Sequence, residues 1–383
     1  MENTKHSKLN RIDWVDHSKA LGMFLVYFGH VVQEISNKGF QSFEILTKFI
    51  YSFHMPLFFI LAGFFFKRRS PSLIKEIKLL FLNRVLPVFY FGVISFPLWP
   101  LLLFLANGFI DWPLILGKTS NYLIGHPDLN TISWFLICLF IAEIFAAVIL
   151  PSVDGLIVGL VVSFIFLRTG LVMTSNFPET VESLKIEKNF WYIHEAVVAF
   201  GLYSLGYSTF KLLRKLAGWK LGLRISLLSA AVILALTTFN LNRPYEHFVV
   251  IMKNSNHGNN WLFLLTAISG TLAVILIATM IPSNKILKFI GQNSLVFLCT
   301  SGIFHHFINP VFVKIMIPLV SESWLILLSF LFTLLTLIAS IPIVMFLKKY
   351  TPQLVGIPQI SGPWLPALIS LDSSSNHLAV LDE

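Results

Sequence analysis

Ten long runs of apolar residues divide this chain, and each is about long enough to cross a lipid bilayer. A membrane-spanning helix needs ~20 mostly apolar residues, and it satisfies its own backbone hydrogen bonds inside the hydrocarbon. The composition agrees, because 56% of the 383 residues are hydrophobic and 12% are charged, against about 25% charged in a soluble domain. The sequence therefore predicts an all-α integral membrane protein with about ten transmembrane helices. The expected spans are residues 15–35, 48–66, 86–106, 132–150, 154–173, 190–210, 224–240, 260–281, 290–308 and 324–346.

Lys and Arg residues are concentrated in alternate loops, and this predicts the orientation of the chain. Cytoplasmic loops of membrane proteins carry an excess of Lys and Arg. If the N-terminus is cytoplasmic, 19 of the 28 basic residues lie on the inner side, eight lie on the outer side, and Arg168 lies within a span. We therefore expect both termini to be cytoplasmic. The net charge of +9 then reflects topology, and we expect no nucleic-acid partner.

We expect one membrane domain over residues 1–350, followed by a flexible cytoplasmic tail over residues 351–383 that has two Pro-containing turns and a Ser-rich end. Three longer outer loops, 107–131, 174–189 and 241–259, are rich in polar residues. They could bind a polar acceptor such as a sugar, or they could merely connect helices. Both cysteines lie inside apolar runs, so we expect neither a disulfide nor a metal site.

Two histidines in the first two spans are candidates for chemistry, because an ionisable group inside a membrane is costly and usually functional. His30 lies in the outer part of the first span, and Glu34 follows one helical turn later on the same face. A carboxylate there could orient the imidazole as a general base. His54 is expected at a similar depth in the second span. Either histidine could instead be structural, hydrogen-bonded within the bundle or positioning a bent helix.

A second group of charged residues is expected at the inner face. Asp16 and Lys19 lie three residues apart at the inner end of the first span; they could pair, or they could anchor the helix at the interface. Loop 67–84 carries six basic residues, which a cytoplasmic location alone would explain. The loop could also bind a polyanionic donor such as coenzyme A, because Arg contacts phosphate in a bidentate manner. The basic residues that we assign to such a site are Arg68, Arg69, Lys78 and Arg84.

Later spans add ionisable residues that could line a polar lumen. Arg168 and Glu195 are both expected in the outer halves of their spans and could pair. Glu143 lies within the fourth span, and His305 and His306 end the ninth. A Gly-rich nucleotide loop, a zinc-ligand spacing and a Gly-x-Ser-x-Gly elbow are all missing from the sequence. Any chemistry must therefore come from helix ends and outer loops.

Several short motifs occur in an order and spacing that together identify a family resemblance. Residues 13–20 and Gly29-His30 give an Asp, a basic residue, a Val-rich run and then Gly-His, and residues 54–64 read His-x-Pro-Leu-Phe-Phe followed by Ala62-Gly63. Over residues 12–346 the chain resembles the membrane acyltransferase-3 family, and most of all its fucose 4-O-acetylase-type bacterial proteins. Further matches are Arg84-Val85-Leu86-Pro87, Trp134-Phe135-Leu136, residues 200–207 and Gly291-Gln292-Asn293-Ser294-Leu295.

The resemblance implies transfer of an acyl group, usually acetyl, from cytoplasmic acyl-CoA to a hydroxyl of an extracytoplasmic glycan. It identifies His30 as the catalytic base or acyl-relay residue and Arg84 as part of the donor site. The sequence departs from the family pattern at Ala62, where Ser is usual. It also has Ser301 where a His is frequent, and Phe81 where the first Arg of an Arg-x-x-Arg pattern is expected. These departures could mean an altered donor site or a divergent role.

We therefore expect a bacterial inner-membrane O-acyltransferase with acetyl-CoA as its donor co-substrate and no metal. Membrane lipids, the glycan acceptor and the polysaccharide-synthesis machinery are the expected partners. The expected catalytic residues are His30, Glu34 and His54. The expected donor-side residues are Arg84, Arg68, Arg69, Lys78, Asp16 and Lys19. The expected acceptor-side residues are Trp134, Arg168, Glu195 and His305.

Two other functions fit the same sequence. The chain could be an exporter or flippase that moves a polysaccharide or a lipid-linked sugar without acyl-transfer chemistry, which would need a cavity wide enough for a sugar. It could also be a sensor or assembly scaffold, in which case the histidines within the membrane would be replaceable without effect.

Overall fold

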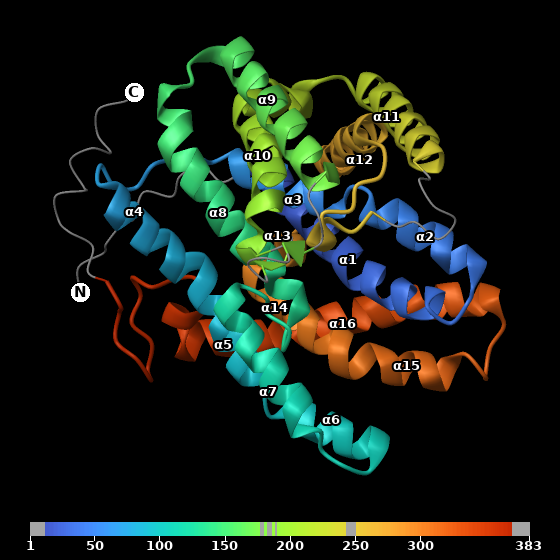
Figure 1. The fold of residues 1–383 in the computed structure, drawn as a ribbon. Coiled ribbons are helices and arrows are strands. Elements are labelled where there is room, and N and C mark those ends of the chain that lie inside the picture. The colour runs from blue at the N-terminus through green and yellow to red at the C-terminus, as the bar shows by residue number, and fades with distance from the viewer. Residues whose placement is uncertain (1–11, 177–179, 182–185, 188–189, 243–249, 370–383) are drawn as a thin grey trace, which may run out of the picture.

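The computed structural model describes residues 12–176, 180–181, 186–187, 190–242 and 250–369. Within these ranges the chain is helical, as predicted, apart from its loops and one antiparallel pair of two-residue strands, β1 (Thr180–Val181) and β2 (Ile186–Glu187). Figure 1 shows α8, α9 and α10 together on one side of α1, and α15 and α16 on another. The α-helices are α1 (Asp13–Ser36), α2 (Gln41–Tyr51), α3 (His54–Gly63), α4 (Leu73–Leu80), α5 (Leu86–Ser95), α6 (Leu98–Asn107), α7 (Trp112–Ser120), α8 (Trp134–Ile149), α9 (Gly155–Asn176), α10 (Ile193–Leu213), α11 (Leu221–Leu241), α12 (Asn260–Met280), α13 (Lys285–Gln292), α14 (Ser294–Ile303), α15 (Asn309–Met316) and α16 (Glu322–Tyr350).

Nine helical stretches among the described residues are long and apolar enough to cross a membrane. α1 is the remaining predicted span. It has 24 residues, more than the ~20 that a span needs, but its acidic, basic and histidine residues make it more polar than the other nine. The prediction of an all-α membrane fold is confirmed. The nine stretches are Gln41–Gly63, Leu73–Ser95, Thr131–Ser152, Gly155–Ser175, Phe190–Gly218, Leu221–Leu241, Asn260–Met280, Ser294–Met316 and Glu322–Tyr350.

The third span lies earlier in the chain than predicted, over Leu73–Ser95 rather than residues 86–106. The charged residues of α4 suggested a loop, but α4 continues into α5 through a π-helical turn, η1 (Phe81–Val85). Pro87 does not end this span, because it lies in the first turn of α5, where a missing N–H is tolerated. Pro97 separates α5 from the short apolar helix α6. The boundaries of this predicted span were therefore wrong.

Two glycines let α3 and α10 pack with their backbones in contact. A Cβ atom on Gly63 would lie 1.9 Å from the carbonyl oxygen of Tyr203, and a Cβ atom on Gly206 would lie 2.0 Å from that of Ile60. Such small residues are the usual means of close helix packing in membranes. A larger residue at either position would therefore push α3 and α10 apart.

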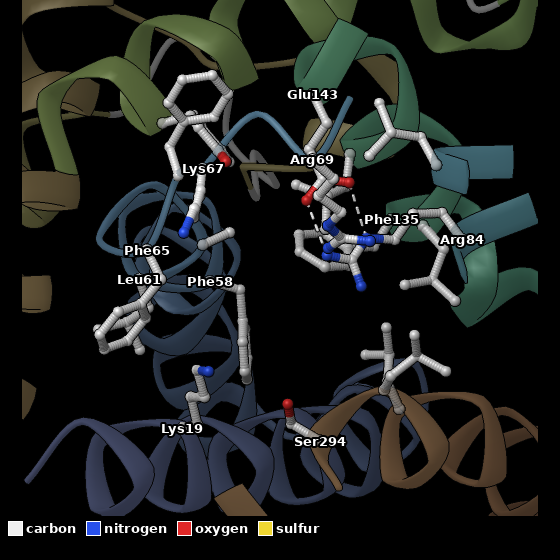
Figure 2. Close-up of a pocket in the computed structure, with 18 of the residues that line it drawn as sticks. Lys19, Phe58, Leu61, Phe65, Lys67, Arg69, Arg84, Phe135, Glu143 and Ser294 are labelled. Atoms are coloured by element: carbon white, nitrogen blue, oxygen red, sulfur yellow. Dashed lines mark hydrogen bonds and ion pairs between the residues drawn. The ribbon is translucent and has the colours of Figure 1, made fainter. Parts of the chain in front are cut away.

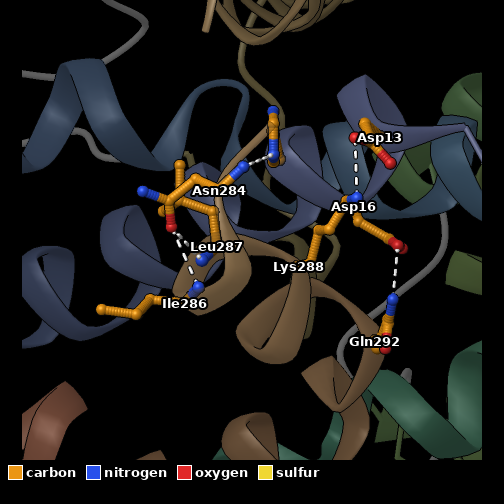
Figure 3. A network of polar contacts seen from close by, with 8 residues as sticks. Asp13, Asp16, Asn284, Ile286, Leu287, Lys288 and Gln292 are labelled. Carbon is orange, nitrogen blue, oxygen red and sulfur yellow. Dashed lines mark hydrogen bonds and ion pairs between the residues drawn. The ribbon is translucent and has the colours of Figure 1, made fainter. Parts of the chain in front are cut away.

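A polar network fixes the start of α1 against α13, as Figure 3 shows. Lys288 lies 2.7 Å from the carboxylate of Asp13, and the Gln292 side-chain amide donates to Asp16 over 3.0 Å. Asp16 therefore bonds to a residue of α13, a partner that its spacing from Lys19 did not suggest. The ninth predicted span, residues 290–308, also begins later than expected, at Ser294, because α13 forms a separate amphipathic helix before it.

The segment that follows α16 packs against the membrane domain over its described part. A short helix, η9 (Pro352–Val355), contacts α5, and the side chain of Gln353 is fully buried. The Tyr90 and Thr351 hydroxyls lie 3.1 Å apart. Residues 370–383 lie outside the described residues, so the predicted division into a domain and a tail at residue 350 stays a prediction.

Candidate functional site

A cavity of about 370 Å³ lies among α1, α3, α4, α8, α10 and α14. We call it the cationic cavity, because four positively charged side chains line it: Lys19, Lys67, Arg69 and Arg84. Its two carboxylates belong to Glu76 and Glu143, so the lining carries two net positive charges. Figure 2 shows Lys19 and Ser294 across the cavity from the Arg84–Glu143 pair, with aromatic rings between them. Such a lining suits a ligand that has phosphate groups and a less polar arm.

The guanidinium of Arg84 is held by Glu143 in a bidentate ion pair. Its Nε donates to Glu143 over 2.8 Å and its Nη2 donates over 2.7 Å. Arg84 belongs to the π-helical turn η1, and Glu143 belongs to α8, so the pair joins the third span to the fourth. The pairing fixes the plane of the guanidinium on the cavity wall and leaves Nη1 for a ligand.

Glu76 holds the loop that supplies two of the four cations. Its carboxylate accepts hydrogen bonds from the backbone N–H groups of Arg69 and Ser70, over 2.9 and 2.7 Å. The side chain of Glu76 is buried although it belongs to the amphipathic helix α4. This carboxylate fixes the loop backbone, and the Lys67 and Arg69 side chains reach the cavity from that fixed backbone.

The six residues assigned to the donor side divide into two groups. Lys19, Arg69 and Arg84 line the cationic cavity. The other three are Arg68, Lys78 and Asp16, and they lie outside its lining. Arg68 donates instead to the carbonyl oxygens of Ser70 and Pro71, Lys78 is exposed on α4, and Asp16 bonds to α13.

Four histidines lie together at a distance from the cationic cavity, on α1, on α3 and in η8, which follows α14. We call His30, His54, His305 and His306, together with Tyr51, the histidine cluster. The ring centres of His30 and His305 lie 4.5 Å apart, and those of His305 and His306 lie 4.9 Å apart. The Tyr51 ring lies 4.8 Å from that of His54, and its hydroxyl lies 2.9 Å from His30 Nδ1. The structure therefore brings His30, His54 and His305 together, although they come from three different spans.

The hydrogen bonds of Tyr51 indicate which nitrogen of His30 carries a proton. The Tyr51 hydroxyl donates its one hydrogen to Gln33 Oε1 over 2.6 Å. Its oxygen can then only accept from His30, so Nδ1 of His30 is the protonated nitrogen in this arrangement. Nε2 is left as the proton acceptor. This is the tautomer that a general base acting through Nε2 requires.

Glu34 does not orient His30 as the spacing suggested. Its carboxylate lies 4.0 Å from Nδ1 of His305, and Tyr51 is the partner of Nδ1 on His30. Residues one helical turn apart share a face, but His305, which belongs to η8 (Phe304–Ile308), lies close to both side chains and is the nearer partner of Glu34. The expected His30–Glu34 pair was therefore wrong, and Glu34 belongs to the surroundings of His305.

Three further residues were expected on the acceptor side, namely Trp134, Arg168 and Glu195. The expected Arg168–Glu195 pair was wrong, because Glu195 bonds to His257 over 3.0 Å and both are buried. Arg168 is exposed on α9, where its guanidinium lies 5.7 Å from the centre of the Trp261 ring. Trp134 is buried at the start of α8. Helical periodicity could not predict that His257, which lies in a loop, would be the partner of Glu195 instead of Arg168.

Three helices connect the cationic cavity to the histidine cluster. α1, α3 and α14 line the cavity with Met23, Phe58 and Leu298. His30 lies seven residues after Met23, His54 lies four residues before Phe58, and His305 lies seven residues after Leu298. At a rise of ~1.5 Å per residue, this places them about 6–10 Å beyond the cavity lining. The two sites therefore lie within reach of one short, flexible chemical arm.

The sequence analysis missed three residues that shape these sites. Tyr51 and Gln33 set the tautomer of His30, and Glu76 fixes the basic loop. Nothing in the sequence distinguishes Glu76 from other carboxylates on amphipathic helices. Tyr51 could have been found, because it lies three residues before His54 and was therefore expected near the candidate histidines. Within the part of the chain that the structure describes, no group of three or more His, Cys, Asp or Glu side chains could hold a metal ion.

Comparison with known proteins adds one finding. The family model described as an acyltransferase domain matches residues 12–347, which is most of the chain. A search of curated proteins and a search of solved structures each found no match. The match covers the cationic cavity, the histidine cluster and all of the spans except the last three residues of the final one. The chain therefore belongs to the acyltransferase-3 family, and it is a multi-pass membrane acyltransferase.

Proposed function

We propose that this enzyme transfers an acetyl or other short acyl group from cytoplasmic acyl-CoA to a hydroxyl of an extracytoplasmic polysaccharide or lipid-linked glycan, in the inner membrane of a bacterium. The observation that carries the proposal is the arrangement along α1, α3 and α14, where a cationic cavity at one end faces a histidine cluster at the other. Family membership does not favour the alternative of an exporter or flippase without acyl-transfer chemistry.

The cationic cavity is the donor site in this proposal. The phosphates of coenzyme A contact Lys67, Arg69 and Arg84, because charge-assisted bonds to phosphate are the strongest that these side chains form. The thioester arm extends past Met23 and Phe58, which are the apolar lining nearest to the histidines. This geometry keeps the highly charged part of the donor at one membrane face while its acyl group approaches the other.

His30 is the general base in this proposal. Nε2 takes the proton from the acceptor hydroxyl as its oxygen attacks the thioester carbonyl. The new C–O bond forms, the C–S bond breaks, and the proton passes from His30 to the departing thiolate. Tyr51 keeps Nδ1 of His30 protonated throughout, and the cycle ends with the imidazole in its starting state.

Binding of acetyl-CoA tests the donor site. The purified protein is titrated calorimetrically with acetyl-CoA, and Lys67→Gln is compared with Arg168→Gln. Lys67 lines the cavity, whereas Arg168 is an exposed cation on α9 and serves as the matched control. We expect Lys67→Gln to raise the dissociation constant about tenfold, because a bond to a charged group contributes ~1.5–3 kcal/mol. Equal constants for both variants and the wild type would place the donor elsewhere.

Mass spectrometry of surface glycans tests the overall reaction. Glycans from cells with the gene should carry O-acyl groups that cells without it lack, and the mass difference identifies acetyl or succinyl. Restoring the gene should restore the modification. Identical glycans from both cells would refute the proposed acceptor class and leave only the acyltransferase family membership.

A further inference from the structure

An apolar groove of about 350 Å³ lies between α5 and the segment formed by α7 and η2 (Asn121–Ile124). Its lining includes Gly92, Val93 and Phe96 on one side and Thr119 and Leu123 on the other. Val93 and Leu123 are 71% and 79% exposed, so the groove opens sideways from the bundle. One wall of the groove, α5, belongs to a stretch that is long and apolar enough to cross a membrane.

The buried end of this groove lies next to the histidine cluster. Leu129 lines the groove, and two residues later Thr131 bonds to His306, with 3.0 Å between its hydroxyl and Nε2. The indole N–H of Trp99 donates to the carbonyl oxygen of Leu129, and its ring lies 5.3 Å from that of His306. Trp99 and residues 129–131 thus connect the lining of the groove to the cluster.

A lysine lies between the two features. The amino group of Lys118 lies 4.3 Å from the centre of the Trp99 ring, and the next residue, Thr119, lines the groove. A molecule that reached from the groove to the histidines would pass this cation. Such a molecule would match its surroundings if it had a hydrocarbon chain, then an anionic group, then a hydroxyl-bearing head.

We propose that the groove binds the hydrocarbon chain of a lipid-linked acceptor, with its phosphate at Lys118 and its sugar at the histidine cluster. This inference rests on the proposed function and narrows its acceptor from any glycan to a membrane-anchored, phosphate-linked one. The chain enters sideways from the bilayer, so the acceptor does not leave the membrane to react. The hydroxyl then approaches His30 from the side opposite to the cationic cavity.

Photolabelling of the full-length protein in phosphatidylcholine vesicles tests the groove. One probe is an isoprenoid monophosphate with a diazirine in its chain, and the comparison probe is phosphatidylcholine with a diazirine in an acyl chain. The isoprenoid phosphate should label residues 89–96 and 119–129 several-fold more strongly than phosphatidylcholine does. Equal labelling by both probes would mean that the groove holds ordinary bilayer lipid, and would overturn the inference.

Variants locate the label and separate this inference from the proposed function. Val93→Trp should lower labelling by the isoprenoid phosphate about tenfold, whereas Val158→Trp, an exposed valine on α9, should not change it. Lys118→Gln should lower it and Lys118→Arg should preserve it, because the arginine keeps the charge. Unchanged labelling in both Val93→Trp and Lys118→Gln would refute the binding of the lipid in this groove. Acetyl-CoA titration of the same vesicles reports separately whether the donor site, and thus the proposed function, survives.

Discussion

Neutralising one member of the Arg84–Glu143 pair distinguishes a donor-binding arginine from a purely structural one. The pair is bidentate, with bonds of 2.8 and 2.7 Å, and the side chains are 22% and 9% exposed. Removing one partner of a buried ion pair costs ~3–5 kcal/mol. Because Arg84 faces a cavity that water can enter, we expect Glu143→Gln to lower the free energy of unfolding by about 2 kcal/mol. Arg84→Gln should have a similar effect.

The double variant provides the structural control. Two glutamines can bond to each other, and replacing both members of an ion pair is often nearly neutral. We expect the Arg84→Gln, Glu143→Gln double variant to lose less stability than the sum of the single variants, with a coupling energy of about 2 kcal/mol. Reversible unfolding of the purified protein in mixed detergent micelles measures all three values.

The dissociation constant of acetyl-CoA should rise in only one of the two single variants. Arg84→Gln removes a phosphate contact worth ~1.5–3 kcal/mol, and should weaken binding about 10- to 100-fold. Glu143→Gln releases the guanidinium and removes a negative charge from the cavity, so binding should be unchanged or tighter. If both variants weaken binding equally, Arg84 acts only through the geometry of the pair, and the reasoning about the donor site is refuted.

Three further changes test other parts of the structure. Tyr51→Phe should lower kcat about 10- to 100-fold while the acetyl-CoA dissociation constant stays the same, because His30 loses the partner that sets its tautomer; an unchanged kcat would contradict this role. Gly206→Leu should lower the free energy of unfolding by about 3 kcal/mol, since a Cβ there would lie 2.0 Å from a carbonyl oxygen of α3; Gly222→Leu, which meets nothing within 4 Å, should be nearly neutral, and similar losses in both would contradict the packing argument. Glu76→Gln should speed hydrogen exchange at the two loop N–H groups it accepts from; unchanged exchange would show that the loop is held elsewhere.

The membrane fold could be predicted from the sequence because the bilayer sets a length that apolar runs must match. The boundary of the third span could not. Lys75 and Lys78 on α4 suggested a loop, but they lie on one exposed face of an amphipathic helix whose other face is buried. A π-helical turn before Pro87 then carries the helix onward, and no local rule marks such a turn in advance.

The sequence indicated candidate residues of the site, but it did not indicate which side chains pair with them. Spacing and the resemblance singled out His30, and the basic loop and the resemblance singled out Arg84. Their actual partners, Tyr51 and Glu143, come from other helices, so periodicity along one helix could not reveal them. The expected local partner of His30 failed for the same reason, because tertiary packing brings His305, from another span, next to both His30 and Glu34.

The rate of acyl transfer by a His30→Ala variant tests the central claim most directly. Membranes from cells that lack the native gene and express either protein are supplied with radiolabelled acetyl-CoA, and the label that enters glycan is counted. The variant must be inserted normally and must bind acetyl-CoA with the wild-type dissociation constant. Loss of a general base predicts a rate about 10²- to 10⁴-fold lower. Transfer at the wild-type rate would contradict the account.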